Sequence, residues 1–344
     1  MINLNRSNPM QIIRGMSLAS LFLLVGAGTV GKTWAQHTQH TGDHTAHQGA
    51  RSGVLVMAHG GIPEWDAGVL ETLAPLRSKY PLEVAFGMAD AWSLQEAITR
   101  LEHQGVSDIA VVRLFISGES WYERTQQILG LIPGAPAREP VPVPVDGGHD
   151  HGETHQQSPG DTSAHGGHRM EFWQVQSGAR FTLSTEGLSD AQQMSEVLLT
   201  RATDLSQNPS AEDVLILAHG PEDDAENERW IASINERAQL LRERGGFHDI
   251  HVATLREDWP EKRELAQAQV RDYLSRSRAE GRTPIVIPYR VHGFGPYAQA
   301  LDGLDYVSDG KGLIPHPAVA DWIEEQIVEL MQSAADAQLL TSRK

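Results

Sequence analysis

One short stretch occurs twice in this chain, and it constrains the fold more than any other feature of the sequence. Residues 54–60 read Val-Leu-Val-Met-Ala-His-Gly and residues 214–220 read Val-Leu-Ile-Leu-Ala-His-Gly. Each is an apolar run of strand length, which is typical of a strand buried on both faces of a parallel sheet. Open α/β sheets bind ligands at the carboxyl ends of their strands. The repeat therefore predicts two related α/β halves that place His59 and His219 at such edges.

The segments between and after the two copies alternate between strand and helix patterns, which indicates right-handed crossovers and parallel sheets. In the first half we expect helices at 64–79, 94–103, 119–131 and 190–205, and strands at 82–86, 109–115 and 180–184. In the second half we expect helices at 225–244, 261–279 and 318–335, and strands at 214–218, 250–255, 284–289 and 304–307. The predicted fold class is α/β, with two tandem domains, each a small parallel sheet flanked by helices, that face a shared cleft. Their predicted ranges are 52–208, interrupted by a Pro- and His-rich insertion at about 133–170, and 209–338.

The first 36 residues have the pattern of a secretory signal peptide. Arg6 and Arg14 precede an uncharged, largely apolar stretch at 16–31, and Thr33-Trp34-Ala35 is a small-x-small cleavage site. An N-terminal membrane anchor is the alternative, but the apolar stretch is shorter than the roughly 20 residues of a spanning helix. We therefore expect an exported, periplasmic protein with no stable membrane insertion after signal cleavage.

Charge and cysteine content exclude several classes of function. The chain has 28 basic and 45 acidic residues, a net charge of −17, and removal of Arg6, Arg14 and Lys32 with the signal leaves 25 against 45, or −20. Nucleic acid and anionic membranes are then not expected as partners. There is no cysteine, which excludes disulfides, thiolate metal sites and a cysteine nucleophile. Histidine and carboxylate side chains must carry any metal chemistry.

Histidine is concentrated in two low-complexity stretches. Nine of the sixteen histidines lie there, four in the 37–51 segment and five in the 149–168 segment: His37, His40, His44, His47, His149, His151, His155, His165 and His168. Both segments are nearly devoid of apolar residues, so we expect them to be disordered. Two interpretations stay open: a multivalent sink for transition-metal ions, and a solvated linker of biased composition.

Further candidate site residues follow the other predicted strands of the second half. Glu257 and Asp258 come after the 250–255 strand, and His292 stands in a His-Gly-Phe-Gly loop after the 284–289 strand. The two acids have a structural alternative, because acidic side chains also favour a helix N-terminus. In the first half the corresponding loop after the 109–115 strand has no histidine but contains Glu119. That half is a degenerate version of the second.

These residues resemble the site of the class II chelatases, the family of sirohydrochlorin cobaltochelatases and ferrochelatases. The resemblance covers about residues 52–131 and 212–331. It implies that a histidine after the first strand, a carboxylate after the second and a histidine after the third converge on the metal and the tetrapyrrole. It assigns these roles to His219, to Glu257 or Asp258, and to His292, although the family more often has its second histidine just beyond the glycine. From the first half it implies contributions of His59 or Glu119 across the cleft.

The expected function is that of a chelatase-like lyase, which inserts a divalent metal ion (Co, Ni or Fe) into a tetrapyrrole. Zn is a further ion that we expect the site to bind. His219, His292 and Glu257 would be catalytic, since neutral imidazole can act as ligand or base and a carboxylate can take a second proton. His59, Asp258 and Glu119 complete the expected set of metal ligands. The alternative is an exported metal-binding or metal-delivery protein that keeps this fold and binds a tetrapyrrole or another small metal-binding molecule without the reaction. A hydrolase is disfavoured because no Gly-x-Ser-x-Gly motif is present.

Overall fold

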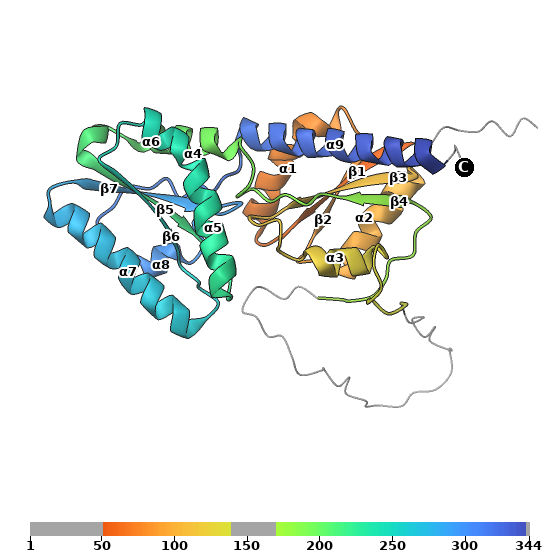
Figure 1. The fold of residues 1–344 in the computed structure, drawn as a ribbon, viewed down its shortest axis with the longest axis horizontal. Coiled ribbons are helices and arrows are strands. Elements are labelled where there is room, and N and C mark those ends of the chain that lie inside the picture. Colours follow the sequence, from red (N-terminus) through yellow and green to blue (C-terminus); the bar gives the residue numbers. More distant parts are fainter. Residues whose placement is uncertain (1–50, 139–169, 342–344) are drawn as a thin grey trace, which may run out of the picture. The chain divides into compact units, whose positions relative to one another are not determined.

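The two repeated segments form the central strands of two parallel sheets in the computed structural model, which describes residues 51–138 and 170–341 (Figure 1). The first sheet has the order β2-β1-β3-β4 and consists of β1 (Ser52–Ala58), β2 (Leu82–Phe86), β3 (Asp108–Leu114) and β4 (Arg180–Leu183). The second has the order β6-β5-β7 and consists of β5 (Glu212–Ala218), β6 (Asp249–Thr254) and β7 (Thr283–Tyr289). All neighbouring strands are parallel. The predicted α/β class, with two small parallel sheets flanked by helices, is confirmed.

Helices connect the strands and cover both faces of each sheet. Those between β1 and β5 are α1 (Pro63–Arg77), α2 (Ala91–His103), α3 (Tyr122–Ile128) and α4 (Met194–Leu205), and a short 3₁₀ turn (Pro209–Ala211) precedes β5. Those after β5 are α5 (Asp224–Arg237), α6 (Gln239–Arg244), α7 (Pro260–Ala279), α8 (Tyr297–Ala300) and α9 (Pro317–Thr341). None of the described helices is long and apolar enough to cross a membrane. The predicted signal peptide, the His-rich segment that follows it and most of the insertion lie outside the described residues.

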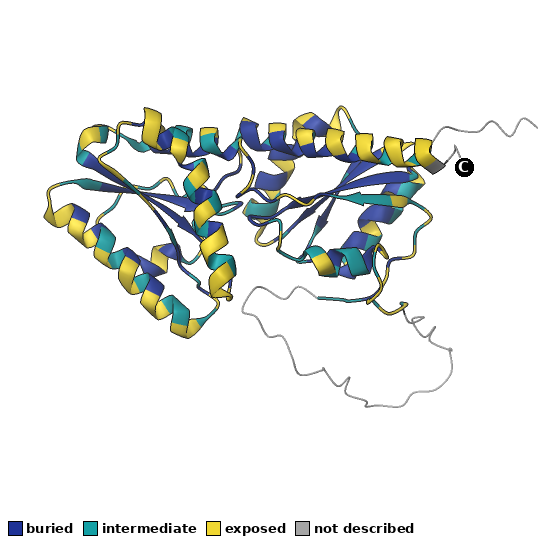
Figure 2. Cartoon of the chain, viewed as in Figure 1, coloured by how far each residue is buried: buried dark blue, intermediate teal, exposed yellow. Residues whose placement is uncertain are grey.

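The apolar runs of the strands are explained by coverage on both faces of each sheet. Val54 and Val56 of β1 belong to one apolar cluster and Leu55 and Met57 to another, and all four are fully buried. Figure 2 shows both sheets as buried strands between helices whose outer sides are exposed. A strand with solvent on one side would show alternating polar residues instead.

Several predicted elements differ from the structure. The helix expected at 225–244 is two helices that meet at Ala238, and the Arg242 side chain donates to the carbonyl of Asn235 across this break (2.9 Å). The helix expected from residue 119 begins at Tyr122, since Trp121 has a left-handed backbone conformation with φ of 59°. The strand expected at 304–307 is reduced to a single bridge, between Ile285 and Val307.

Two helices pack outside the half of the sequence in which they occur. Helix α4 precedes β5, yet it packs against α6 and β7. Helix α9 ends the second half, yet it packs against α1, β3 and β4 of the first half, along which it runs in Figure 1. One continuous buried cluster accordingly contains residues of both halves. The two sheets therefore share part of their core.

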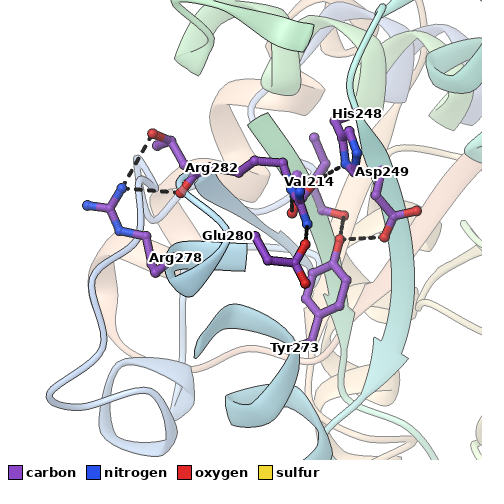
Figure 3. A network of polar contacts seen from close by, with 9 residues as sticks. Val214, His248, Asp249, Tyr273, Arg278, Glu280 and Arg282 are labelled. Carbon is purple, nitrogen blue, oxygen red and sulfur yellow. Dashed lines mark hydrogen bonds and ion pairs between the residues drawn. The ribbon is translucent and has the colours of Figure 1, made fainter. Parts of the chain in front are cut away.

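The amino ends of the second sheet are tied together by a network of polar contacts (Figure 3). The buried carboxylate of Asp213 accepts bonds from Nδ1 of His248 (2.8 Å) and Nε of Arg282 (2.7 Å). The hydroxyl of Tyr273 donates to Asp249 (2.9 Å). These contacts satisfy a buried charge at the edge of the sheet opposite to His219, so His248 has a structural role.

Candidate metal centre

His219 lies between two carboxylates at the carboxyl end of the second sheet. It follows β5, and the acids follow β6, the strand that pairs with β5. Nδ1 of His219 lies 2.8 Å from Oε1 of Glu257, and Nε2 lies 3.3 Å from Oδ2 of Asp258. The turn that brings the acids there contains Arg256 with a φ of 55°, whose guanidinium donates to the carbonyl of Pro221 (2.8 Å). His219 is thus in contact with both acids that follow β6.

The carboxylate of Glu257 is buried and only partly satisfied. Its Oε1 accepts an ion-paired bond from Nη1 of Arg290 in addition to the contact with His219. Its Oε2 is buried and has no hydrogen-bond partner among the described residues. The indole of Trp259 packs beside the imidazole of His219, with ring centroids 5.8 Å apart. A buried acceptor oxygen without a hydrogen-bond partner lowers the stability of the fold. We therefore interpret this cluster as a candidate binding site and not only as part of the packing.

Burial and the neighbouring carboxylates shift the pKa of His219 in opposite directions. Burial by itself lowers the pKa of its imidazole, but the hydrogen bonds and charges of Asp258 and Glu257 outweigh it and raise the pKa to about 9. For Glu257 burial would raise the pKa, whereas His219 and Arg290 together hold it below its ordinary value. These shifts favour a protonated imidazole of His219 beside an ionised Glu257 at neutral pH.

This pairing predicts a pH dependence of stability. Because the folded pKa of His219 lies above the unfolded value of 6.5, its contribution is complete below pH 6.5 and is lost as the pH rises through about 9. We expect the difference in unfolding free energy between the parent and a His219→Gln variant to shrink over this range in denaturant titrations. His103→Gln, an exposed position on α2, is the control. A difference that stays constant or grows with pH would contradict the assignment.

His292 and His59 lie at another part of the site, and both are close to Trp65 of helix α1. The ring centroids of His59 and His292 are 6.1 Å and 6.5 Å from that of Trp65. Nδ1 of His59 also lies 2.6 Å from the carbonyl oxygen of Gly60. Burial lowers the pKa of His292, while Glu64 acts weakly in the opposite direction. The loops after β1 and β7 therefore meet at Trp65.

The acids of the first half are engaged in other contacts. Glu119 forms a bidentate ion pair with Arg229 of α5, at 2.8 Å and 2.9 Å. Asp90, near the position of the second-half acids, caps α2 by accepting from the backbone of Ser93 (2.8 Å) and also accepts from Glu171 (2.8 Å). These roles agree with the interpretation of the first half as degenerate.

The six candidate residues do not form one preassembled cluster. In residues 51–138 and 170–341 no three His, Asp or Glu side chains are arranged so as to hold a metal ion. His219, Glu257 and Asp258 are in contact, His59 and His292 share Trp65, and Glu119 pairs with Arg229. Convergence of His219 and His292 on one ion stays a prediction.

The sequence reasoning did not single out Arg290 or Gly68. Arg290 forms an ion pair with Glu257. The sequence feature that could have indicated it is a cationic residue two positions before His292, at the end of the same strand. Gly68 lies against the ring of His292. The sequence feature that could have indicated it is a glycine inside a helical pattern. Both depend on contacts between segments that are far apart in the sequence.

No protein-family model matches this sequence, and neither does any curated protein sequence. Among solved structures the chain is similar to DR2241 from Deinococcus radiodurans, described as a multi-domain protein with structural similarity to chelatases. The identity is 22%, 82% of this chain and 55% of that chain are covered, and the TM-score is 0.47. It is also similar to the sirohydrochlorin chelatase SirB from Bacillus subtilis subspecies spizizenii in complex with cobalt, with 14% identity, coverage of 81% and 95%, and a TM-score of 0.48. At these values the likeness concerns fold, and the chemistry of this chain rests on its own residues.

Proposed function

We propose that this protein binds one divalent transition-metal ion at His219 and acts as a chelatase-like lyase that inserts the ion into a tetrapyrrole. The observation that carries the proposal is the imidazole of His219 held between the buried Glu257 and the half-exposed Asp258. Imidazole and carboxylate are the donors available to a chain without cysteine, and they suit Co, Ni, Fe and Zn ions.

The two carboxylates have different roles in this proposal. Glu257 accepts from Nδ1 of His219 at 2.8 Å and so orients the ring, as an outer carboxylate commonly does for a metal-binding histidine. Nε2 then faces Asp258 across a longer contact of 3.3 Å. The ion replaces the proton between Nε2 and Asp258, and His292 supplies a further donor. Glu257 thus supports the ion through His219 instead of binding it.

A site of this kind holds its ion loosely. Closed structural sites use four protein ligands, whereas sites that pass an ion on or act on a substrate keep positions open. Two or three donors from this chain leave such positions for pyrrole nitrogens. The acceptor must lose two N–H protons during insertion, and neutral imidazole is a suitable base. The position of the first-half His59 beside Trp65 makes it a candidate base for one of these protons, and the other passes to solvent.

Metal delivery without the reaction is the second candidate function. It is favoured by the two His-rich segments of the sequence. In that case the site holds an ion for transfer to another small metal-binding molecule. Export to the periplasm is part of both proposals.

The metal site is tested by calorimetry with Co²⁺ on the full-length chain in which the nine histidines of the His-rich segments are replaced by serine. We expect one specific Co²⁺ site, whose affinity falls by about 100-fold or more in His219→Ala and in His292→Ala, because each variant removes a donor. His59→Ala should weaken it less, and His103→Ala is the control. If both second-half variants bind Co²⁺ as the parent does, the site is assigned wrongly.

The reaction is tested separately by mixing the Co²⁺-loaded protein with uroporphyrin, an octacarboxylate porphyrin, and following the absorbance change of metal insertion. An insertion rate above that of free Co²⁺, lost in His219→Ala, supports the lyase. Tight Co²⁺ binding without acceleration, found also with sirohydrochlorin as acceptor, favours delivery.

A further inference from the structure

Helix α1 contains a glycine where a helix former would be more stable. Gly68 lies in the interior of α1, five residues after its first residue Pro63, and is buried. Glycine in a helix interior costs about 1 kcal/mol relative to alanine. Its backbone conformation is not the reason for the glycine, since it is not among the residues with positive φ. The reason must lie in what the missing side chain leaves room for.

The space above Gly68 is filled by the ring of His292. A Cβ atom at position 68 would lie 2.6 Å from Cδ2 and 3.0 Å from Nε2 of that imidazole. Trp65 precedes Gly68 by one helical turn, so it lies on the same face of α1. Its indole meets the same imidazole edge to face, with an interplanar angle of 67°. The first half thus provides a fitted surface for a histidine of the second half.

The backbone of the two residues before His292 is held by the segment that leads to α9. Leu313 donates to the carbonyl of Arg290 (2.7 Å), and Ile314 donates to that of Val291 (2.9 Å). Gly312 allows this approach, because a Cβ there would lie 2.8 Å from the Cα of His292. The residue is therefore constrained at its backbone and at its ring, and small residues on both sides make room for it.

We infer that Gly68 and Trp65 are positioning residues for His292, so that the first half acts as the support of the second-half site and not as a second site. Where it concerns metal binding, this inference rests on the proposed function, in which His292 is a metal ligand. It explains why the first half keeps α1 and Trp65 although its own acids, Glu119 and Asp90, serve other contacts. A support that fixes a donor in advance reduces the ordering cost of binding.

The experiment compares Gly68→Ala with Gly178→Ala, a glycine with nothing within 4 Å of its added Cβ. The first readout is the nuclear Overhauser contact between the rings of His292 and Trp65 in the metal-free, full-length protein. We expect it to be lost in Gly68→Ala and kept in Gly178→Ala. The second readout is Co²⁺ binding and the visible Co²⁺ spectrum, measured in the chain with the serine-substituted His-rich segments. We expect Gly68→Ala to lower Co²⁺ affinity about 10-fold and to shift the spectrum towards that of His292→Ala.

The double variant Gly68→Ala/His292→Ala shows whether the loss of affinity in Gly68→Ala is caused by a general folding defect. Removal of the imidazole frees the space for the new methyl group, so we expect the double variant to be as stable as His292→Ala and to bind Co²⁺ with the same affinity. Additive losses of affinity, or an unchanged ring contact in Gly68→Ala, would overturn the inference. If His219→Ala binds Co²⁺ as the parent does, the proposed function fails instead, and the ring contact still decides whether Gly68 and Trp65 position His292.

Discussion

Replacement of Arg113 by methionine is expected to lower the free energy of unfolding by about 4 kcal/mol, because several carbonyl groups would lose their donor. Arg113 is only 1% exposed and lies at the carboxyl end of β3. Its guanidinium donates to the carbonyls of Ser184 (2.9 Å), Ser120 (2.8 Å) and Gly118 (2.7 Å). It also lies over the ring of Tyr122, 4.7 Å from the centroid.

The balance of these interactions is unusual for a buried cation. Burial lowers the pKa of Arg113 to about 10, and no carboxylate contributes to that shift. The charge is therefore stabilised by carbonyl dipoles and by an aromatic face instead of a salt bridge. Methionine retains much of the apolar stem but none of the donors, so the loops after β3 and β4 lose one set of the hydrogen bonds that join them.

Chemical denaturation with parallel fluorescence and circular dichroism measures this loss. Arg100→Met is the matched control, since Arg100 is half-exposed and pairs with Glu83 on the surface, where ion pairs contribute about 0–1 kcal/mol. A decrease below about 1 kcal/mol for Arg113→Met would mean that water replaces the arginine in these bonds.

Replacement of Glu257 by alanine is expected to affect both stability and metal binding. Its removal leaves Arg290 without its buried partner, and breaking a buried ion pair in this way costs about 3–5 kcal/mol. It also removes the acceptor that orients His219 through Nδ1. Loss of such an outer carboxylate lowers metal affinity by about 10–100-fold, so we expect weaker Co²⁺ binding with the binding stoichiometry unchanged.

Glu257→Gln separates the two effects. The amide keeps the volume and one acceptor oxygen but loses the charge that pairs with Arg290, so its stability should lie between those of the parent and Glu257→Ala. Glu264→Ala, an exposed position on α7, is the control and should change stability by less than about 0.5 kcal/mol. Complete loss of the Co²⁺ site in Glu257→Gln would indicate that Glu257 is itself a ligand.

The sheets and the strand-end histidines could be predicted because their signals are local. A run such as residues 214–218 is apolar at every position only when both faces of the strand are covered. The histidine that follows it then stands at the carboxyl edge whatever the rest of the chain does. Glu257 and Asp258 were expected there for the same reason, since they follow a neighbouring strand of the same sheet.

The packing of α4 and α9 was not predictable from their own sequences. Both are amphipathic, but an apolar helix face is compatible with either sheet, and the choice depends on the full set of surfaces available to it. The structure places α4 against β7 and α9 against β3 and β4. The same dependence on distant segments explains why the ion pair of Glu119 with Arg229 could not be predicted.

Periodicity and strand direction within short segments predicted two parallel sheets, a histidine at the end of each central strand and two acids after the neighbouring strand. Contacts between distant segments, which exist only in the folded chain, pair Glu257 with Arg290, place His292 on Gly68 and Trp65, and connect loops of the first half through a buried arginine. Side chains interact when they are close in space, whatever their separation in the sequence. Gly68 and His292 come together only when the two sheets pack around a common core.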